Sequence, residues 1–545
     1  MTPGGGPVGR RGLRRLGPCA AIVVLVLVCL PAQAAAQMQT ALATGPTSLD
    51  VALLESVVGT ALNFLGPRTL EPYSDRQFSL WGLGGLTALD PSLTVESRDG
   101  LVRLLAADRL VTAERAPADA DLAGWTELVG RLTQAAWQHS DALRMLGQPA
   151  LIQSFFDELC NHLDPYSRYV APVPARSERS NREGATADCG ITVVRSGRTV
   201  LITAVNANGP AWAAGLSAGQ RLLAIDGRPT RGRDLGDIQQ ALQGRAGSAV
   251  SLTVAPAGRG LAQTVSISRA QVPPETVFAF SSGDIVVLRI TGFSSDTAEE
   301  MSQFLDQASQ AGSGGSSPGA ALAPMRGLVF DLRGNRGGLL QQAVTAVALV
   351  LDHGVAVVTR GRDPDANHIW AVRGGDLTGG VPIVVLVDGR TASAAEIMAA
   401  ALADHRRAVV VGSATLGKGL VQTIAQLPDG GELFVTWSRV LAPLGWPLQG
   451  LGVMPEICTS LGGSALGRTM AALARGDLDS SRTLVAERRL RPPVPAARIM
   501  EIRATCPPAI GSDTDLDVAK TLIDDPTRYH AALLPDAVAA AVDTP

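Results

Sequence analysis

The 545-residue sequence predicts a multidomain protein of mixed α+β and α/β class, and three observations divide it. Apolar residues recur at helical spacing from about residue 48 to 162, which predicts a helical N-terminal region. Short β-type runs bounded by Gly- and Asp-rich turns follow over about 188–269, which favours a compact, partly open β-barrel. From about 284 to 458, continuous apolar runs alternate with helical patterns. This predicts a mixed α/β core whose strands are buried on both faces of a sheet.

The remainder of the chain is assigned by composition and by helical pattern. After about residue 460, helix-like stretches separated by Pro-rich turns predict a helical C-terminal extension. The segment 311–320 is rich in Gly and Ser, which is typical of an inserted surface loop. We therefore expect a signal segment at 1–36 and four regions, which span 37–180, 181–272, 273–462 and 463–545.

Composition excludes several classes of protein. Hydrophobic residues make up 46% and charged residues 18%, which is a globular balance rather than that of a disordered chain. A formal net charge of −3 argues against a general nucleic-acid binder, which would carry a basic surplus. The six His are scattered without an HExxH motif, and no CxxC is present. We therefore expect no metal site and no cofactor.

The first residues have the pattern of a secretory signal peptide. A positive stretch comes first, formed by Arg10, Arg11, Arg14 and Arg15. The apolar run Cys19–Leu30 follows, about 12 residues long where a bilayer span needs about 20, and small residues continue to Ala36. Cleavage near Ala36 would give an exported protein, soluble in the bacterial periplasm. The alternative is an uncleaved N-terminal anchor.

Four cysteines remain after such cleavage. An even number in an oxidising compartment permits two disulfides. The shortest loops favour Cys160–Cys189 and Cys458–Cys506. Four buried thiols are the alternative.

The first candidate catalytic segment follows the predicted strand at 381–387. A Gly turn and a run of small residues lead from this strand into an apolar helix and place Ser393 at the junction. Backbone N–H groups at a helix N-terminus favour negative charge, which suits a nucleophile whose attack creates an oxyanion. The alternative is that Ser393 is only an N-cap, with Glu396 completing a capping box.

The second segment surrounds Lys418. Residues 412–419 imitate a phosphate-binding loop, but Gly419 stands where Ser or Thr would hold magnesium. Flanking glycines let the backbone pack closely, and a Lys that loses solvent has a lowered pKa and can act as a neutral general base. Because no suitable His lies nearby, Lys418 is the obvious partner for Ser393. A neighbouring amide such as Gln422 could orient the amine.

The third segment runs from Asp331 to Gly338. A Gly-rich turn after a buried strand can aim backbone N–H groups outward and supply half of an oxyanion hole. The alternative is a plain strand-to-helix turn.

Six motifs, in order along about 150–460, resemble the carboxyl-terminal processing peptidases, also called tail-specific proteases. One precedes the β-rich region, one is similar to the PDZ signature, and four lie in the predicted core. They are Leu163–Tyr169, Gly209–Leu216 with Gly219 and Leu222–Gly227, Asp331–Leu340, Thr391–Ala394, Gly417–Gly419 with Gln422, and Gln449–Glu456. The resemblance implies that the partly open barrel is a PDZ-like domain and the core a serine protease.

The resemblance also implies roles for individual residues. Ser393 would be the nucleophile, Lys418 the general base 25 residues later, and Gln422 the residue that orients the lysine. The oxyanion hole would combine the backbone N–H of Ala394 with one from Gly337 or Gly338.

Substrate recognition follows from the same resemblance. The PDZ-like domain would bind the free C-terminus of a protein or peptide substrate, with its carboxylate near Gly190, Ile191 and Thr192. The insertion and the two flanks lie outside the match. They are candidate surfaces for a homo-oligomer or for an adaptor or regulator protein.

Four positions depart from the family pattern, and two of them, Ala395 for a common Ser and Leu416 for a common Phe, remove no chemistry. Arg336 stands where the family usually has Pro, so the oxyanion turn could be set differently. Tyr166 replaces a common His, at a site that the dyad does not need.

These observations favour an exported serine endopeptidase that cleaves proteins near their C-termini through an acyl-enzyme. Two alternatives stay open. The departure at Arg336 would fit a PDZ scaffold that binds protein tails with an inactive site. The imitation of a phosphate-binding loop at 412–419 would fit a nucleotide-binding protein.

Overall fold

A computed structural model describes most of the chain after residue 47. The described ranges are 48–183, 187–197, 199–206, 209–256, 260–271, 275–312, 325–476 and 479–535. The predicted signal peptide at 1–36 and residues 313–320 of the predicted insertion lie outside them. No helix within these ranges is long and apolar enough to cross a membrane.

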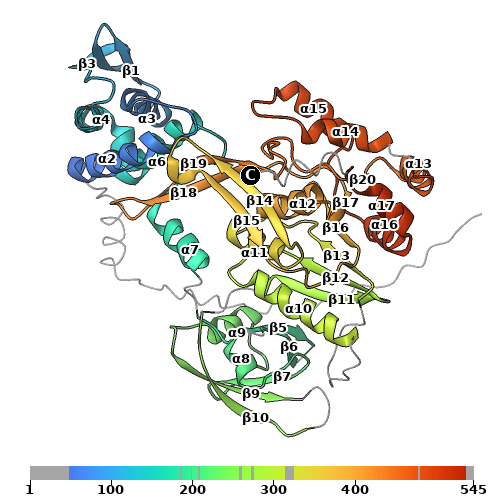
Figure 1. Cartoon of the computed structure of the whole chain (residues 1–545). Helices are drawn as coiled ribbons and strands as arrows, with labels where there is room; N and C mark the ends of the chain where they lie inside the picture. The colour runs from blue at the N-terminus through green and yellow to red at the C-terminus, as the bar shows by residue number, and fades with distance from the viewer. Residues whose placement is uncertain are drawn as a thin grey trace, which may run out of the picture. The chain divides into compact units, whose positions relative to one another are not determined.

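The N-terminal region is mainly helical, as predicted, and is drawn in blue to blue-green in Figure 1. Its helices are α2 (Val51–Arg68), α3 (Asp75–Leu89), α4 (Leu122–His139), α5 (Asp141–Leu146) and α6 (Gln148–Asn161). Their buried faces include Phe78, Trp125 and Phe156. A methyl group added at Gly85 of α3 would lie 2.5 Å from the carbonyl oxygen of Ser154 in α6, so this glycine allows the two helices to approach closely.

The prediction of an all-helical N-terminal region is wrong for residues 93–115. These residues form an antiparallel sheet of three strands, β1 (Leu93–Arg98), β2 (Leu101–Ala106) and β3 (Arg109–Arg115). Asp99 and Gly100 join the first two strands, and Ala107 and Asp108 join the next two, all with positive φ between 47° and 72°. Two-residue turns with positive φ match the twist of paired strands, and Asp-Gly is their strongest sequence signal.

The β-rich region folds as the sequence predicts. It contains β5 (Ile191–Ser196), β6 (Thr199–Val205), β7 (Arg221–Ile225), β8 (Arg228–Pro229), β9 (Ala249–Ala255) and β10 (Gln263–Ser268), with helices α8 (Pro210–Ala213) and α9 (Leu235–Leu242). The strand order is β10-β9-β7-β6-β5, with β8 paired to β7. Strand β5 therefore lies at one edge of the sheet, where one side of its backbone has no partner strand among those described.

The core contains the predicted helix-covered sheet. Its strands, in spatial order, are β11 (Val277–Ser282), β12 (Ile285–Ile290), β13 (Gly327–Asp331), β16 (Ile383–Val387), β17 (Ala408–Gly412) and β20 (Ile457–Cys458). Strands β11 and β12 pair antiparallel, and every later neighbour pair is parallel. In β12, Val286 and Leu288 belong to one apolar cluster, and Ile285 and Val287 belong to another. The strands are thus buried on both faces, as their continuous apolar runs predict.

Helices cover each face of this sheet. One face packs against α10 (Thr297–Gly312), α11 (Leu340–Ala348) and α12 (Ala394–Asp404). The other packs against α13 (Gly463–Ala474), α16 (Asp513–Asp524) and α17 (Pro526–Ala532). Helices α14 (Asp479–Arg488) and α15 (Ala496–Ala504) lie in the same part of the chain as α13, α16 and α17. Together these helices confirm the predicted helical C-terminal extension.

A second sheet in the core has no counterpart in the sequence predictions. Its strands are β15 (His368–Arg373), β14 (His353–Arg360), β19 (Glu432–Leu441) and β18 (Leu420–Gln426), and β4 (Arg168–Val170) also pairs with β19. A short 3₁₀ helix (Pro364–Ala366) lies between β14 and β15, and α7 (Pro172–Glu183) follows β4. All the pairings are antiparallel. Figure 1 shows β18 and β19 running beside the N-terminal helices.

Of the two favoured disulfides, one is confirmed and one is wrong. Cys458 is bonded to Cys506, which joins the end of the core sheet to the C-terminal extension. Cys160 and Cys189 are free thiols. Each is buried in a different environment, Cys160 in α6 and Cys189 in the apolar core of the β-rich region, so the short loop between them does not bring their sulfurs together.

Candidate active site

The site begins at the carboxyl edge of the parallel sheet. Strands β13 and β16 are parallel neighbours, so the loops that follow them lie side by side. Hydrogen bonds join these loops. The Ala392 N–H donates to the Asn335 carbonyl (2.9 Å), and the Gly334 N–H donates to the Asp388 carboxylate (2.9 Å). Burial opposes ionisation of Asp388, but donated backbone N–H groups outweigh it and hold the pKa of this carboxyl below its ordinary value.

Ser393 occupies a sharp turn at the start of α12. Its backbone has φ 58° and ψ −120°, in a region that non-glycine residues rarely adopt. Such a conformation costs of order 1–3 kcal/mol and persists only where the surroundings impose it. Ser393 is half-buried. The backbone N–H of the next residue, Ala394, has no acceptor among the described residues. The helix N-terminus therefore has a free donor beside the hydroxyl.

Glu396 links the Ser393 turn to the Lys418 segment. Its fully buried carboxylate accepts the Ser393 N–H at 2.7 Å and the Lys418 N–H at 2.9 Å, both on the same oxygen, Oε2. Its other oxygen accepts the Gly417 N–H at 2.6 Å and the Thr415 hydroxyl. Burial raises the pKa of Glu396, and these four hydrogen bonds oppose the rise. Glu396 thus does provide part of a capping box, but it also fixes the second segment.

Glycines on both sides of Lys418 allow the close packing that the sequence predicts. A methyl group at Gly417 would lie 3.0 Å from the backbone of Gly450, and one at Gly419 would lie 2.2 Å from the backbone nitrogen of Gln449. The Gly419 N–H also donates to the Gln449 side chain at 2.9 Å. The segment that carries Lys418 is therefore held between the Glu396 carboxylate and the 448–450 backbone.

The Lys418 ammonium lies in a partly desolvated position. Burial lowers its pKa, the positive charge of Arg168 lowers it further, and the Glu396 carboxylate acts in the opposite direction. Its nitrogen lies 5.2 Å from the centroid of the Tyr166 ring. Within the described part of the chain, no hydrogen bond or ion pair joins this nitrogen to another side chain, Ser393 included.

Gln422 lies on β18, just past an irregularity between Val421 and Gln422 in its pairing with β19. Its side-chain amide donates to the backbone carbonyl of Tyr166. Contacts therefore connect the three predicted catalytic residues in series: Ser393 and Lys418 share Glu396, and Lys418 and Gln422 share Tyr166.

The two candidates for the second oxyanion donor differ in their hydrogen bonding. Gly337 lies against Ser393, since a methyl group there would be 2.8 Å from the Ser393 Cβ and 2.9 Å from the Ala394 nitrogen. Its own N–H donates to the Asn335 side chain at 2.8 Å. The N–H of Gly338 has no acceptor among the described residues. The exposed side chain of Arg336 precedes both glycines.

The predicted tail-binding residues lie at the start of the edge strand β5. Gly190 has φ 72°, donates its N–H to the Asp188 side chain at 2.6 Å, and accepts the Asn206 N–H at 2.8 Å. Ile191 and Thr192 open β5 and pair with β6 on one side only. An extended peptide could add to the other side of this strand.

Comparisons with known proteins match both parts of this architecture. Residues 284–459 match the description "Peptidase family S41", and residues 201–256 match "PDZ domain". The carboxy-terminal-processing protease of Bartonella bacilliformis is 33% identical over 307 residues, which cover 56% of this chain and 69% of that protein. The chain belongs to peptidase family S41. It is a serine-type peptidase of the C-terminal processing group and carries a PDZ domain.

The S41 peptidase resembles further proteins. The carboxyl-terminal-processing protease of Picosynechococcus is 36% identical over 299 residues, covering 54% of this chain and 69% of that protein. Among solved structures, the photosystem II D1 C-terminal processing protease is 25% identical and covers 72% of this chain and 97% of its own, with a TM-score of 0.35.

The composition of this S41 peptidase carries a further sequence signal at the predicted base. Of its 47 basic residues only two are lysines, Lys418 and Lys520. Arginine serves every other basic position, but a guanidinium cannot act as a general base because its pKa exceeds about 12. A lone lysine in the predicted catalytic segment therefore favours amine chemistry there.

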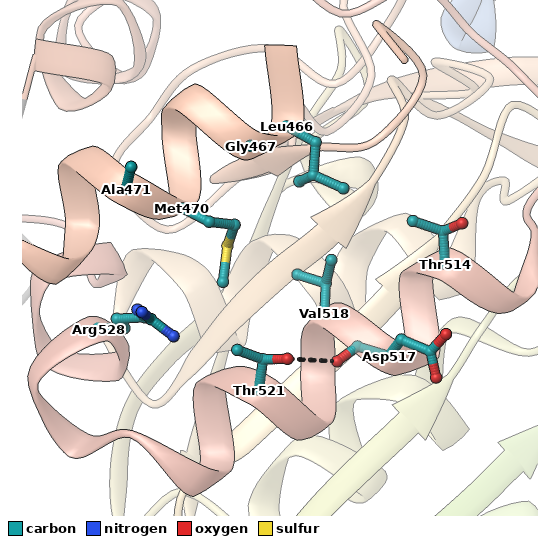
Figure 2. A pocket seen from close by; sticks show the side chains of 9 residues that line it. All are labelled: Leu466, Gly467, Met470, Ala471, Thr514, Asp517, Val518, Thr521 and Arg528. Carbon is teal, nitrogen blue, oxygen red and sulfur yellow. Dashed lines mark hydrogen bonds between the residues drawn. The ribbon is translucent and has the colours of Figure 1, made fainter. Parts of the chain in front are cut away.

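A hollow elsewhere on the S41 peptidase is separate from these residues. It has a volume of about 470 Å³ and lies between α13 and α16, with Arg528 of α17 at one end (Figure 2). Leu466, Met470 and Val518 supply much of its apolar lining. None of the predicted catalytic residues lines it.

Proposed function

We propose that this S41 peptidase is an exported endopeptidase that cleaves protein substrates near their C-termini with a Ser393–Lys418 dyad. One observation carries the proposal. A single buried carboxylate oxygen, Glu396 Oε2, accepts the backbone N–H groups of both residues, at 2.7 and 2.9 Å. The nucleophile and the base are thus held by the same group, although 25 residues separate them.

The mechanism is acyl transfer. The Ser393 hydroxyl attacks the substrate carbonyl carbon while the neutral Lys418 amine takes its proton. The Ala394 and Gly338 N–H groups, neither of which has an acceptor among the described residues, donate to the resulting oxyanion. The Lys418 ammonium then gives its proton to the leaving amine as the C–N bond breaks. Water, deprotonated by the same lysine, hydrolyses the acyl-enzyme and frees Ser393.

Recognition of the substrate tail is assigned to the PDZ domain. Backbone hydrogen bonds to the open edge of β5 would hold the tail as an added strand. The start of that strand, at Ile191 and Thr192, would lie near the terminal carboxylate. Gly190 contributes shape there rather than a donor, because its N–H is bonded to Asp188.

Export is assigned to residues 1–36. The positive stretch, the apolar run and the small residues up to Ala36 support a cleaved signal peptide that directs the enzyme to the bacterial periplasm. N-terminal sequencing of the protein from a periplasmic extract should begin just after Ala36. An intact N-terminus on a membrane-bound product would favour the anchor instead.

The test of the activity uses a matched pair of substrates. Purified mature protein and Ser393→Ala are incubated with an unstructured protein that ends in apolar residues, with either a free or an amidated C-terminus. The parent should cleave the free form, cleave the amidated form more slowly, and Ser393→Ala should cleave neither. Equal cleavage of both forms would contradict tail recognition. Equal cleavage by the parent and Ser393→Ala would contradict the nucleophile.

If neither protein cleaves the substrate, a second experiment tests whether Ser393 is reactive. A fluorophosphonate that reacts with activated serines should label the parent at Ser393 and leave Ser393→Ala unlabelled. Failure to label the parent would contradict the peptidase proposal and favour a scaffold that binds protein tails.

A further inference from the structure

Tyr166 contacts two members of the proposed catalytic set from a distant part of the chain. It lies in the segment between α6 and β4, more than 250 residues before Lys418 and Gln422. The face of its ring lies toward the Lys418 ammonium, 5.2 Å from nitrogen to ring centroid. Its backbone carbonyl accepts the side-chain amide of Gln422. The resemblance to the family places Tyr166 outside the dyad, yet one contact is with Lys418 and the other with Gln422, the residue predicted to orient that lysine.

The segment that carries Tyr166 is rigidly attached. The Asp164 carboxylate accepts the Tyr166 N–H at 2.9 Å and the Ser167 N–H at 3.0 Å. The same carboxylate accepts the Thr436 hydroxyl at 2.7 Å, and the Thr436 N–H donates to the Ser167 hydroxyl at 3.0 Å. Thr436 of β19 is the residue paired with Gln422 of β18. The loop is therefore fixed at the rung of the sheet from which Gln422 projects.

Two charged side chains also act on the Lys418 ammonium, and neither holds it through a hydrogen bond or an ion pair. Arg168, at the start of β4, repels the ammonium, and Glu396 of α12 attracts it. The Glu396 carboxylate is occupied by four hydrogen bonds from Ser393, Thr415, Gly417 and the Lys418 backbone. Among the described residues, the ammonium makes no hydrogen bond or ion pair with a side chain, and its nitrogen lies over the Tyr166 ring. The negative face of an aromatic ring attracts a cation and not a neutral amine.

We propose that Tyr166 is a positioning residue of the dyad, whose ring holds the protonated Lys418 and whose carbonyl fixes Gln422 beside it. This inference rests on the proposed role of Lys418 as the base. The ammonium is held on the ring between turnovers, and the neutral amine, which the ring does not attract, is free to turn toward the Ser393 hydroxyl. Removal of the aromatic face should therefore make the ammonium easier to deprotonate.

The low lysine content allows a direct test. In a Ser393→Ala background, competitive acetylation with acetic anhydride over a pH series reads the ionisation of Lys418 by mass spectrometry, with Lys520, the other lysine, as internal reference. Tyr166→Leu keeps the carbonyl and an apolar side chain but has no aromatic face, whereas Tyr166→Phe keeps both ring and carbonyl. The Lys418 pKa should fall in Tyr166→Leu by roughly half a unit to one and a half units. It should keep the parental value in Tyr166→Phe.

The effect of the Tyr166 ring on catalysis is measured in variants that retain Ser393. The acid limb of the pH profile of kcat/KM should move to lower pH in Tyr166→Leu by the same shift and stay in place in Tyr166→Phe. Tyr73→Leu is the matched control. Tyr73 is another half-buried tyrosine of the N-terminal region, it packs against Phe78 and Trp81, and its loss should move neither measurement.

Three outcomes distinguish a failure of the Tyr166 inference from a failure of the proposed function. An unchanged Lys418 pKa in folded Tyr166→Leu would overturn the inference, and Tyr166→Met replaces Tyr166→Leu if that variant does not fold. A shift in the acetylation pKa without a shift in the kcat/KM profile would overturn Lys418 as the base, and the catalytic part of the inference with it. Parallel shifts would support both.

Discussion

Lys418→Arg is expected to lower kcat/KM by at least about a thousandfold across the working pH range. Arginine keeps the positive charge and an apolar stem, but its guanidinium does not give up a proton in proteins. The parental kcat/KM should instead rise with pH as Lys418 becomes neutral. Burial and the charge of Arg168 lower the pKa of Lys418, so this rise should occur below the ordinary pKa of a lysine. Steady-state kinetics over a pH series measure both.

Lys520→Arg is the matched control for this substitution, because it changes the one other lysine of the chain, on α16. It should keep the parental kcat/KM and the parental pH profile. Labelling of Ser393 by a fluorophosphonate should be lost in Lys418→Arg and kept in Lys520→Arg. Lys418→Arg that retained a tenth or more of the parental kcat/KM would contradict the assignment of the base.

The parts of the fold that were predicted correctly are those encoded by neighbouring residues. The runs 285–288, 327–330 and 408–411 are apolar without interruption, and the structure buries each as a strand of the central sheet. Residues 235–242, between two of the β-type runs, form helix α9, whose Ile238 and Leu242 are buried at helical spacing. Periodicity within one element depends only on which side of that element is buried, so it can be read from the sequence.

The errors arose where pairing partners or turn geometry decide the structure. Residues 93–115 contain apolar residues that fit helical spacing, but their two tight turns with positive φ impose a sheet. The strands β14, β15, β18 and β19 alternate in burial too irregularly to be recognised alone. The prediction of a Cys160–Cys189 bond was based on separation along the chain. It did not take into account that the two sulfurs are buried in different parts of the fold.

The candidate site shows the same division. Ser393, Lys418 and Gln422 could be named because family motifs preserve their order, and Ser393 with Glu396 also fits a capping box. That the Glu396 carboxylate also binds Lys418, 22 residues further along, requires the loop after β17 to return beside α12. The position of Tyr166 depends on an even longer connection, through β4 and β19. These contacts result from tertiary packing, and no local pattern records them.

Glu396→Gln is expected to lower kcat/KM by about a hundredfold and to lower the free energy of unfolding by about 1–3 kcal/mol. The carboxylate accepts four hydrogen bonds, two on each oxygen. An amide has one accepting oxygen, so its NH₂ group would face either the N–H groups of Ser393 and Lys418 or the Thr415 hydroxyl and the Gly417 N–H. Because Ser393 is held at φ 58°, a loss of these bonds would release the turn and separate Ser393 from Lys418.

Glu300→Gln separates the catalytic effect from the loss of stability. Glu300 is also buried, and its carboxylate accepts the backbone N–H groups of Thr276 and Val277 at 2.9 Å, but it lies on α10 and has no hydrogen bond to Ser393 or Lys418 among the described residues. Urea unfolding should show comparable destabilisation in both variants, and the large fall in kcat/KM should occur only in Glu396→Gln. Equal kcat/KM values in the two variants would mean that Glu396 contributes only to the stability of the fold and not to catalysis. The shared carboxylate would then no longer explain how the Ser393 turn and the Lys418 segment are held together for catalysis.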